Sequence, residues 1–180
     1  MDTLVIILIV LVVVLIGVGV LLLVQRNRSQ RLKDRFGPEY HRALDESDSR
    51  LEAERELVER EQHRQAFELR ELDPGIRQHY EEEWRGLQQR FVDEPRDAVL
   101  DADRLLIDVM RDRGYPIEDF ERRAADISVD HPTVVDDYRT AHAIALRVYE
   151  DRADTEDLRQ AVIHYRSLFD DLLNGRSARE

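Results

Sequence analysis

The sequence predicts an all-α protein: one N-terminal transmembrane helix, a charged helical spacer and a small helical-bundle domain of four main helices plus one short one. Three observations predict this class. The chain begins with a long uncharged apolar run, apolar residues then recur at steps of three and four, and only 7 Gly and 5 Pro occur among 180 residues. With 37% charged residues, this composition is typical of helices rather than of turn-rich β structure. No stretch alternates apolar and polar residues long enough to predict a strand.

The first predicted element is a transmembrane helix at residues 3–24. This run carries no charge and consists almost entirely of Leu, Ile and Val. At a rise of 1.5 Å per residue, it spans about 30 Å, the thickness of a bilayer core. A cleaved signal peptide is the alternative, but it needs a basic start, a shorter apolar run and small residues before the cut. The sequence lacks these features, which favours an uncleaved signal-anchor.

A basic juxtamembrane segment at 25–36 follows. It contains five basic residues and one acidic residue; the basic ones are Arg26, Arg28, Arg31, Lys33 and Arg35. The positive-inside rule therefore predicts a single-pass protein of the cell membrane, with its N-terminus outside and its C-terminal domain in the cytoplasm. The five basic side chains are expected to contact anionic lipid headgroups, each contributing about 1 kcal/mol. An extracytoplasmic envelope protein with inverted topology is the alternative.

The charge changes sign beyond this segment. Five basic and two acidic side chains give residues 1–36 a net charge of +3, so the total of −12 leaves −15 for residues 37–180. An anionic membrane surface repels such an acidic body. Nucleic acid is not expected as a partner, because binding phosphates requires a basic face.

The second predicted element is a charged helical spacer at 37–72. Gly37-Pro38 interrupts the helix that leaves the membrane, and opposite charges then recur at helical spacing, which favours a mostly solvated, semi-rigid helix. Leu44, Leu51 and Val58 are seven residues apart, so a dimeric coiled coil is the alternative. The companion heptad positions are polar, which argues against it.

The third predicted element is a helical bundle domain at 73–174, followed by a flexible tail at 175–180. Asp73-Pro74 is typical of a helix start. Each helix carries an apolar stripe, and the stripes are Ile76, Tyr80, Trp84, Leu87 and Phe91; Val99, Ala102, Leu106, Val109 and Met110; Phe120 and Ala124; Val134 or Val135, Tyr138, Ala141, Ala145 and Val148; and Leu158, Val162, Tyr165, Leu168, Phe169 and Leu172. Short connections predict antiparallel neighbours around one core.

Several short sequence motifs lie along this body. They are Arg90-Phe91-Val92-Asp93, Ala102-Asp103, Val109-Met110-Arg111-Asp112-Arg113-Gly114-Tyr115-Pro116, Asp119-Phe120-Glu121-Arg122-Arg123-Ala124-Ala125-Asp126, Asp130-His131-Pro132 and Asp157-Leu158-Arg159-Gln160-Ala161. The set resembles a family of uncharacterised actinobacterial proteins, small chains with one N-terminal apolar segment that are described as membrane or secreted proteins. The resemblance covers about 36–174 and implies no activity and no catalytic residues.

The sequence contains no recognisable catalytic motif. GxSxG, P-loop and GxGxxG patterns do not occur, and the absence of Cys excludes thiolate metal sites and cysteine nucleophiles. None of the six His lies in an HExxH motif. Asp130-His131-Pro132 resembles half of a catalytic triad, but a cap at the start of a further helix explains it better. We therefore predict a protein that is not an enzyme and binds no cofactor or metal.

One charge pattern stands out. Asp97, Asp101, Asp108 and Asp112 fall within about 60° of one helix face, at 100° per residue. The simplest interpretation is a solvated face, and the functional one is a docking face for a partner with a basic segment. The chain is thus predicted to be a non-enzymatic, membrane-anchored interaction or scaffold protein. The alternative is a small-ligand-binding or enzymatic helical domain with a pocket between its helices.

Overall fold

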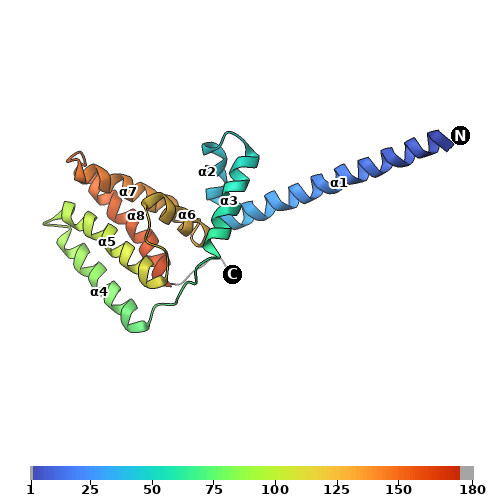
Figure 1. Ribbon diagram of the computed structural model, residues 1–180. Coiled ribbons are helices and arrows are strands. Elements are labelled where there is room, and N and C mark those ends of the chain that lie inside the picture. The colour runs from blue at the N-terminus through green and yellow to red at the C-terminus, as the bar shows by residue number, and fades with distance from the viewer. Residues whose placement is uncertain (1, 175–180) are drawn as a thin grey trace.

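The computed structural model describes residues 2–174, in which eight helices and no strand occur (Figure 1). The helices are α1 Asp2–Phe36, α2 Pro38–Glu46, α3 Arg50–Arg64, α4 Pro74–Arg90, α5 Pro95–Arg113, α6 Phe120–Asp130, α7 Val135–Tyr149 and α8 Thr155–Asn174. The all-α prediction is confirmed. The predicted flexible tail at 175–180 lies outside the described residues.

α1 is an uninterrupted helix of 35 residues that projects from the body (Figure 1). Among the described residues it is the one helix long and apolar enough to cross a membrane, as judged by length and composition, and its apolar stretch is the uncharged run at 3–24. Apolar side chains along it are open to the surroundings; Leu15 is 61% and Leu23 62% exposed. Such a continuous apolar surface is unfavourable in water and fits a lipid environment.

The last turns of α1 belong to the folded body. They contribute to a small apolar cluster, here called the junction core, which consists of Leu32, Phe36, Tyr40, Ala43, Ala53, Leu57 and Val129. These residues come from α1, α2, α3 and α6. Gly37 has a positive φ of 48°, a conformation that glycine adopts easily, and it turns the chain sharply from α1 into α2. The helix that carries the apolar span is therefore continuous with one that is packed into the body.

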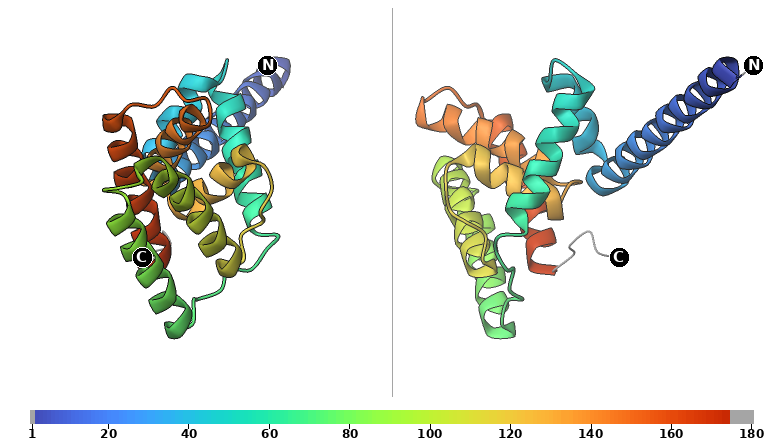
Figure 2. Two further views of the ribbon diagram at one scale, coloured as in Figure 1. Left: turned by 90° about the vertical axis from the view of Figure 1, so that its left-hand side faces the viewer. Right: turned by 45° about the vertical axis from the view of Figure 1, so that its right-hand side comes forward.

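Residues 37–72 differ from the predicted solvated helix. They form a hairpin of α2 and α3 that packs against the end of α1 and against α6 (Figure 2). Ser49 caps α3 by accepting a hydrogen bond from the backbone N–H of Glu52. The correction has a physical reason: Tyr40, two alanines and one leucine form the buried face, a pattern too sparse to mark an amphipathic helix.

The three residues of the predicted heptad do not share one environment in the hairpin. Leu51 is 64% exposed, whereas Leu44 and Val58 are partly buried against the junction core. The single chain described here does not test a dimeric coiled coil, which stays a prediction.

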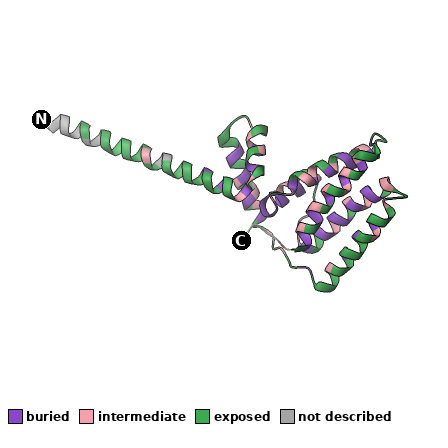
Figure 3. Ribbon diagram, turned by 180° about the vertical axis from the view of Figure 1, so that it is seen from behind, coloured by how far each residue is buried: buried purple, intermediate pink, exposed green. Residues whose placement is uncertain are grey.

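α4, α5, α7 and α8 form the bundle around a second, larger core. α8 packs along α7 and α5, and α4 covers α5 (Figure 1). Buried residues line the facing sides of these helices (Figure 3). Trp84 is 4% exposed and stacks on Phe169, with the ring centroids 4.6 Å apart. The predicted stripes are buried with few exceptions, of which Ile76 at the start of α4 is 42% exposed.

α6 belongs to both regions, since it contacts α3 on one side and α7 on the other. Its Val129 lies in the junction core and its Ile127 in the bundle core. Asp130 is the last residue of α6, and α7 begins only at Val135. The interpretation of Asp130-His131-Pro132 as a cap at the start of a helix is therefore wrong.

Candidate functional site at the junction of the membrane helix and the body

Three of the buried carboxylates around the junction core tie several helices together. Glu39 of α2 is 1% exposed, Glu54 of α3 8% and Asp130 of α6 2%. A carboxylate removed from water without a partner is strongly destabilising. Each of the three is accordingly bound by donors from other parts of the chain, and together they connect α1, α2, α3, α6 and α7.

Glu39 connects the hairpin to the bundle. Arg139 of α7 donates from both Nη atoms to the two carboxylate oxygens, at 2.6 and 2.7 Å, and Arg60 of α3 donates to Oε1 at 2.7 Å. Burial raises the pKa of Glu39, but the hydrogen bonds and charges of Arg139 and Arg60 outweigh it and hold this pKa below its ordinary value. Glu39 thus stays ionised, and its carboxylate links α2 to Arg60 of α3 and to Arg139 of α7.

Glu54 connects α3 to the membrane helix. It accepts hydrogen bonds from the Ser29 hydroxyl of α1, from the Tyr40 hydroxyl at 2.8 Å and from Nε of Arg50 at 2.8 Å. Burial raises the pKa of Glu54, and these three donors lower it further than burial raises it. The hydroxyl of Ser29 is therefore tied to the body only five residues beyond the predicted span.

Asp130 lies at the end of α6. It is bound by Nε of Arg64 and accepts a hydrogen bond from the Tyr115 hydroxyl at 3.2 Å. Nη2 of Arg35 lies 3.9 Å from it. These contacts join α1, α3 and the α5–α6 connection around one carboxylate.

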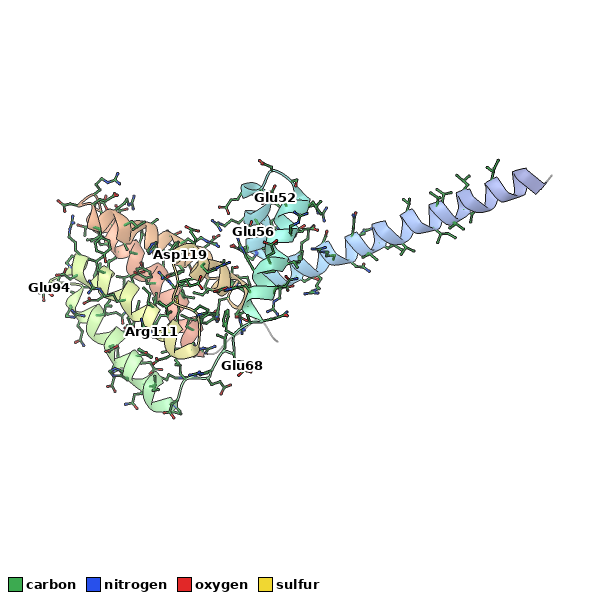
Figure 4. The ribbon with its side chains drawn as sticks, viewed as in Figure 1. Glu52, Glu56, Glu68, Glu94, Arg111 and Asp119 are labelled. Carbon is green, nitrogen blue, oxygen red and sulfur yellow. The ribbon has the colours of Figure 1, made fainter. Side chains whose placement is uncertain are left out.

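A polar cavity of about 710 Å³ opens beside Asp130. Charged residues dominate its wall: Arg31, Arg35, Glu61, Arg64, Glu68, Arg70, Glu71, Arg113 and Asp130. Glu68 lies in the link between α3 and α4 (Figure 4). The wall thus carries five arginines against four carboxylates, a small excess of positive charge.

The five predicted lipid-contact residues fall into two groups. Arg26 and Arg28 are exposed, and Nζ of Lys33 lies 5.5 Å from the centre of the Tyr40 ring.

Arg31 and Arg35 instead pair with carboxylates of the body, although the side chain of Arg31 is 70% exposed. Arg31 donates to Glu61 at 2.6 Å, and Arg35 lies within 4.0 Å of both Glu61 and Asp130. Local sequence could not separate the two groups, because Glu61 lies 30 residues from Arg31.

The four aspartates of the predicted docking face lie on α5, and three of them have partners within the chain. Asp101 accepts hydrogen bonds from Arg90 and Arg104 at 2.9 Å, Asp108 is bound by Arg111, and Asp112 accepts from the Tyr80 hydroxyl at 2.7 Å. Asp97 is exposed near the start of α5. The face is acidic, but less of its charge is available to a partner than the sequence suggests.

Histidines form contacts that sequence inspection missed. His131 is fully buried at its side chain, and its Nδ1 lies 2.5 Å from Asp171 of α8. Nδ1 of His63 lies 2.7 Å from Asp126, which joins α3 to α6. Both partners are more than 35 residues away along the chain, so no local pattern could reveal them. In residues 2–174, no group of three or more His, Cys, Asp or Glu side chains is placed to hold a metal ion.

Comparison with known proteins adds no family to this description. No known protein family, curated protein or solved structure matches the chain. The structure by itself defines an all-α protein with one candidate membrane-spanning helix, whose end is joined to the body by the junction core, by the Ser29–Glu54 hydrogen bond and by ion pairs of Arg31 and Arg35.

Proposed function

We propose that this protein is a non-enzymatic, membrane-anchored interaction or scaffold protein that holds an acidic helical body at a defined position on the membrane. The observation that carries the proposal is the continuity of α1, which runs without a break from the apolar stretch into the junction core. A flexible linker would let the body sample many orientations. A continuous helix that is fixed by Glu54, Glu61 and Asp130 restricts them.

The topology proposed is N-terminus outside and body in the cytoplasm of the cell. It is supported by the five basic residues between 26 and 35. A fluorescent protein fused to the C-terminus should become fluorescent in cells, and alkaline phosphatase at the same place should stay inactive. The reverse pair of results would establish the inverted, extracytoplasmic topology.

A protein partner with a basic segment is proposed for the acidic face of α5. The support is the net charge of −15 on residues 37–180 and the exposure of Asp97. Asp97→Asn combined with Asp108→Asn leaves the hydrogen bonds of Asp101 and Asp112 intact. This variant should lose a partner that the unaltered full-length protein retains at low salt and releases at high salt.

The matched control for this experiment is Glu81→Gln combined with Glu82→Gln. It removes the same number of exposed charges from α4 instead of α5. Equal partner recovery with both double variants would show that the α5 face is merely solvated.

A second candidate function, binding of a small anion, is supported by the cavity beside Asp130, whose wall carries five arginines against four carboxylates. A panel of small carboxylates and phosphates should then raise the melting temperature of the full-length protein in proportion to occupancy. An unchanged melting temperature across the panel at millimolar concentration would remove this candidate.

A further inference from the structure

A second cavity, here called the membrane-side groove, lies between the basic segment of α1 and the first turn of α3. Its volume is about 740 Å³. Four cationic side chains line it together with one carboxylate, Glu54; the cations are Arg26, Arg28, Lys33 and Arg50. Positive charge is thus in excess, although the protein as a whole is acidic.

Glu54 offsets only one of the four positive charges, through its ion pair with Arg50. It is buried and already accepts hydrogen bonds from Ser29, Tyr40 and Arg50. Arg50 uses its Nε for this bond, and its side chain is 57% exposed. Its two Nη groups therefore remain for an acceptor from outside the described residues, in a fork geometry that suits phosphate.

The groove lies at the membrane end of the body. Ser29 of α1 binds Glu54, whereas Arg31 and Arg35, which are further from the apolar stretch, contact Glu61, which is further along α3. α3 therefore runs in the same general direction as α1, away from the apolar stretch, and its first turn is its membrane end (Figure 2).

The helix register places the α1 side of the groove at headgroup depth. Arg26 and Arg28 follow the predicted span at 3–24 by two and four residues. At the rise of an α-helix they lie about 3 to 6 Å beyond the hydrocarbon core. The headgroup layer of one leaflet is about 5 to 8 Å thick.

We propose that the membrane-side groove binds the phosphate of an anionic phospholipid headgroup, with Leu51 resting at the boundary between headgroups and acyl chains. The inference rests on the proposed membrane anchoring and extends it: Arg50 and Leu51 of the hairpin become part of the lipid contact, and Arg31 and Arg35 do not. Leu51 lines the groove and is 64% exposed, an apolar surface that a soluble phosphate would not cover. A lipid supplies both the phosphate and the apolar chain.

The test is native mass spectrometry of the full-length protein in detergent micelles. Dioleoyl phosphatidylglycerol is titrated against dioleoyl phosphatidylcholine, which has the same acyl chains and no net charge. We expect tighter retention of phosphatidylglycerol by about fivefold for each cation that contacts the phosphate. Equal retention of the two lipids would overturn the proposal.

Two variants and one control assign the site. Arg50→Gln and, separately, Arg28→Gln should each weaken phosphatidylglycerol retention about fivefold and phosphatidylcholine retention less, because the choline ammonium of that lipid offsets the charge of its phosphate. Arg28 is exposed, so its variant tests the site even if Arg50→Gln perturbs the fold through Glu54. Arg55→Gln is the control: it changes the same charge in the same helix, about 140° from Arg50. Equal losses for Arg50→Gln, Arg28→Gln and Arg55→Gln would reduce the effect to net charge and overturn the groove.

Two further arms separate other causes of failure. Glycerol 3-phosphate at the lipid concentration should not displace the lipid, and displacement would assign the groove to a soluble phosphate instead. Resistance of the cellular protein to alkaline carbonate extraction tests the anchor independently. If the protein resists carbonate but shows no lipid preference, only the proposed lipid binding in the membrane-side groove is refuted. If carbonate releases the protein, both the proposed membrane anchoring and the lipid binding are refuted.

Discussion

The junction region and the bundle bury similar helices by different chemistry. The bundle core is built from apolar and aromatic side chains, such as the stacked pair of Trp84 and Phe169. The junction core contains only seven buried apolar residues, and charged groups such as Glu39, Glu54 and Asp130 are buried around it. Apolar burial is non-directional and supplies stability, whereas a buried ion pair costs desolvation energy but tolerates only one geometry. The difference indicates that the bundle supplies stability and the junction supplies orientation.

The largest effect is expected from a substitution in the apolar core of the bundle. Trp84→Ala removes the indole that stacks on Phe169 and should lower the free energy of unfolding by about 3–5 kcal/mol. Chemical denaturation of the full-length protein in detergent, followed by circular dichroism, measures it. Exposed Val92, at 82% accessibility, provides the control, and Val92→Ala should change stability by less than about 0.5 kcal/mol. A denaturation curve unchanged by Trp84→Ala would contradict the assignment of this residue to the core.

The next largest effect is expected from removing a buried carboxylate at the junction. Glu39→Ala leaves Arg60 and Arg139 without their common acceptor and should cost about 3 kcal/mol, the lower end for breaking a buried ion pair. We expect the low end because both arginine side chains keep some contact with water, at 10% and 14% exposure. Hydrogen exchange should show the loss in α2 and α3, with α5 and α8 still protected. Uniform loss of protection in all helices would contradict the separation of the two regions.

The smallest expected effect is the dependence of the junction's stability on pH. The pKa values of Glu39 and Glu54 are lower in the folded protein than their ordinary value of 4.5. Their contribution to stability is therefore fully present above pH 4.5 and is lost as the pH falls through the lower folded values. Asp126 acts in the opposite direction, because burial raises its pKa above 3.8 despite the hydrogen bond and charge of His63.

Acidification from pH 6 to pH 3 should consequently loosen the hairpin before the bundle. Amide hydrogen exchange in α3, compared with exchange in α8 and corrected for the intrinsic pH dependence, is the measurement. Glu39→Gln should remove part of this pH dependence. A hairpin whose relative protection is the same at both pH values would show that the two carboxylates do not stabilise it through their ionised forms.

The sequence by itself determined the features that depend on neighbouring residues. The apolar run, the basic segment and the helices of the bundle are recognisable because hydrophobic periodicity and start signals such as Asp73-Pro74 act within one or two turns. The structure confirms the all-helical fold, the side chain of Asp73 caps α4, and Gly114 ends α5 in a left-handed conformation.

Only the tertiary structure decided how α1 and the hairpin are joined to the bundle. Arg60 and Arg139, which bind Glu39, lie 21 and 100 residues away along the chain, and Arg64 lies 66 residues from Asp130. In the sequence, nothing distinguishes these residues from the many other charged residues of helices that are predicted to be solvated. Their burial becomes favourable only when folding brings opposite charges together with the correct geometry. For the same reason, a segment that reads as a charged spacer forms the junction between the membrane helix and the body.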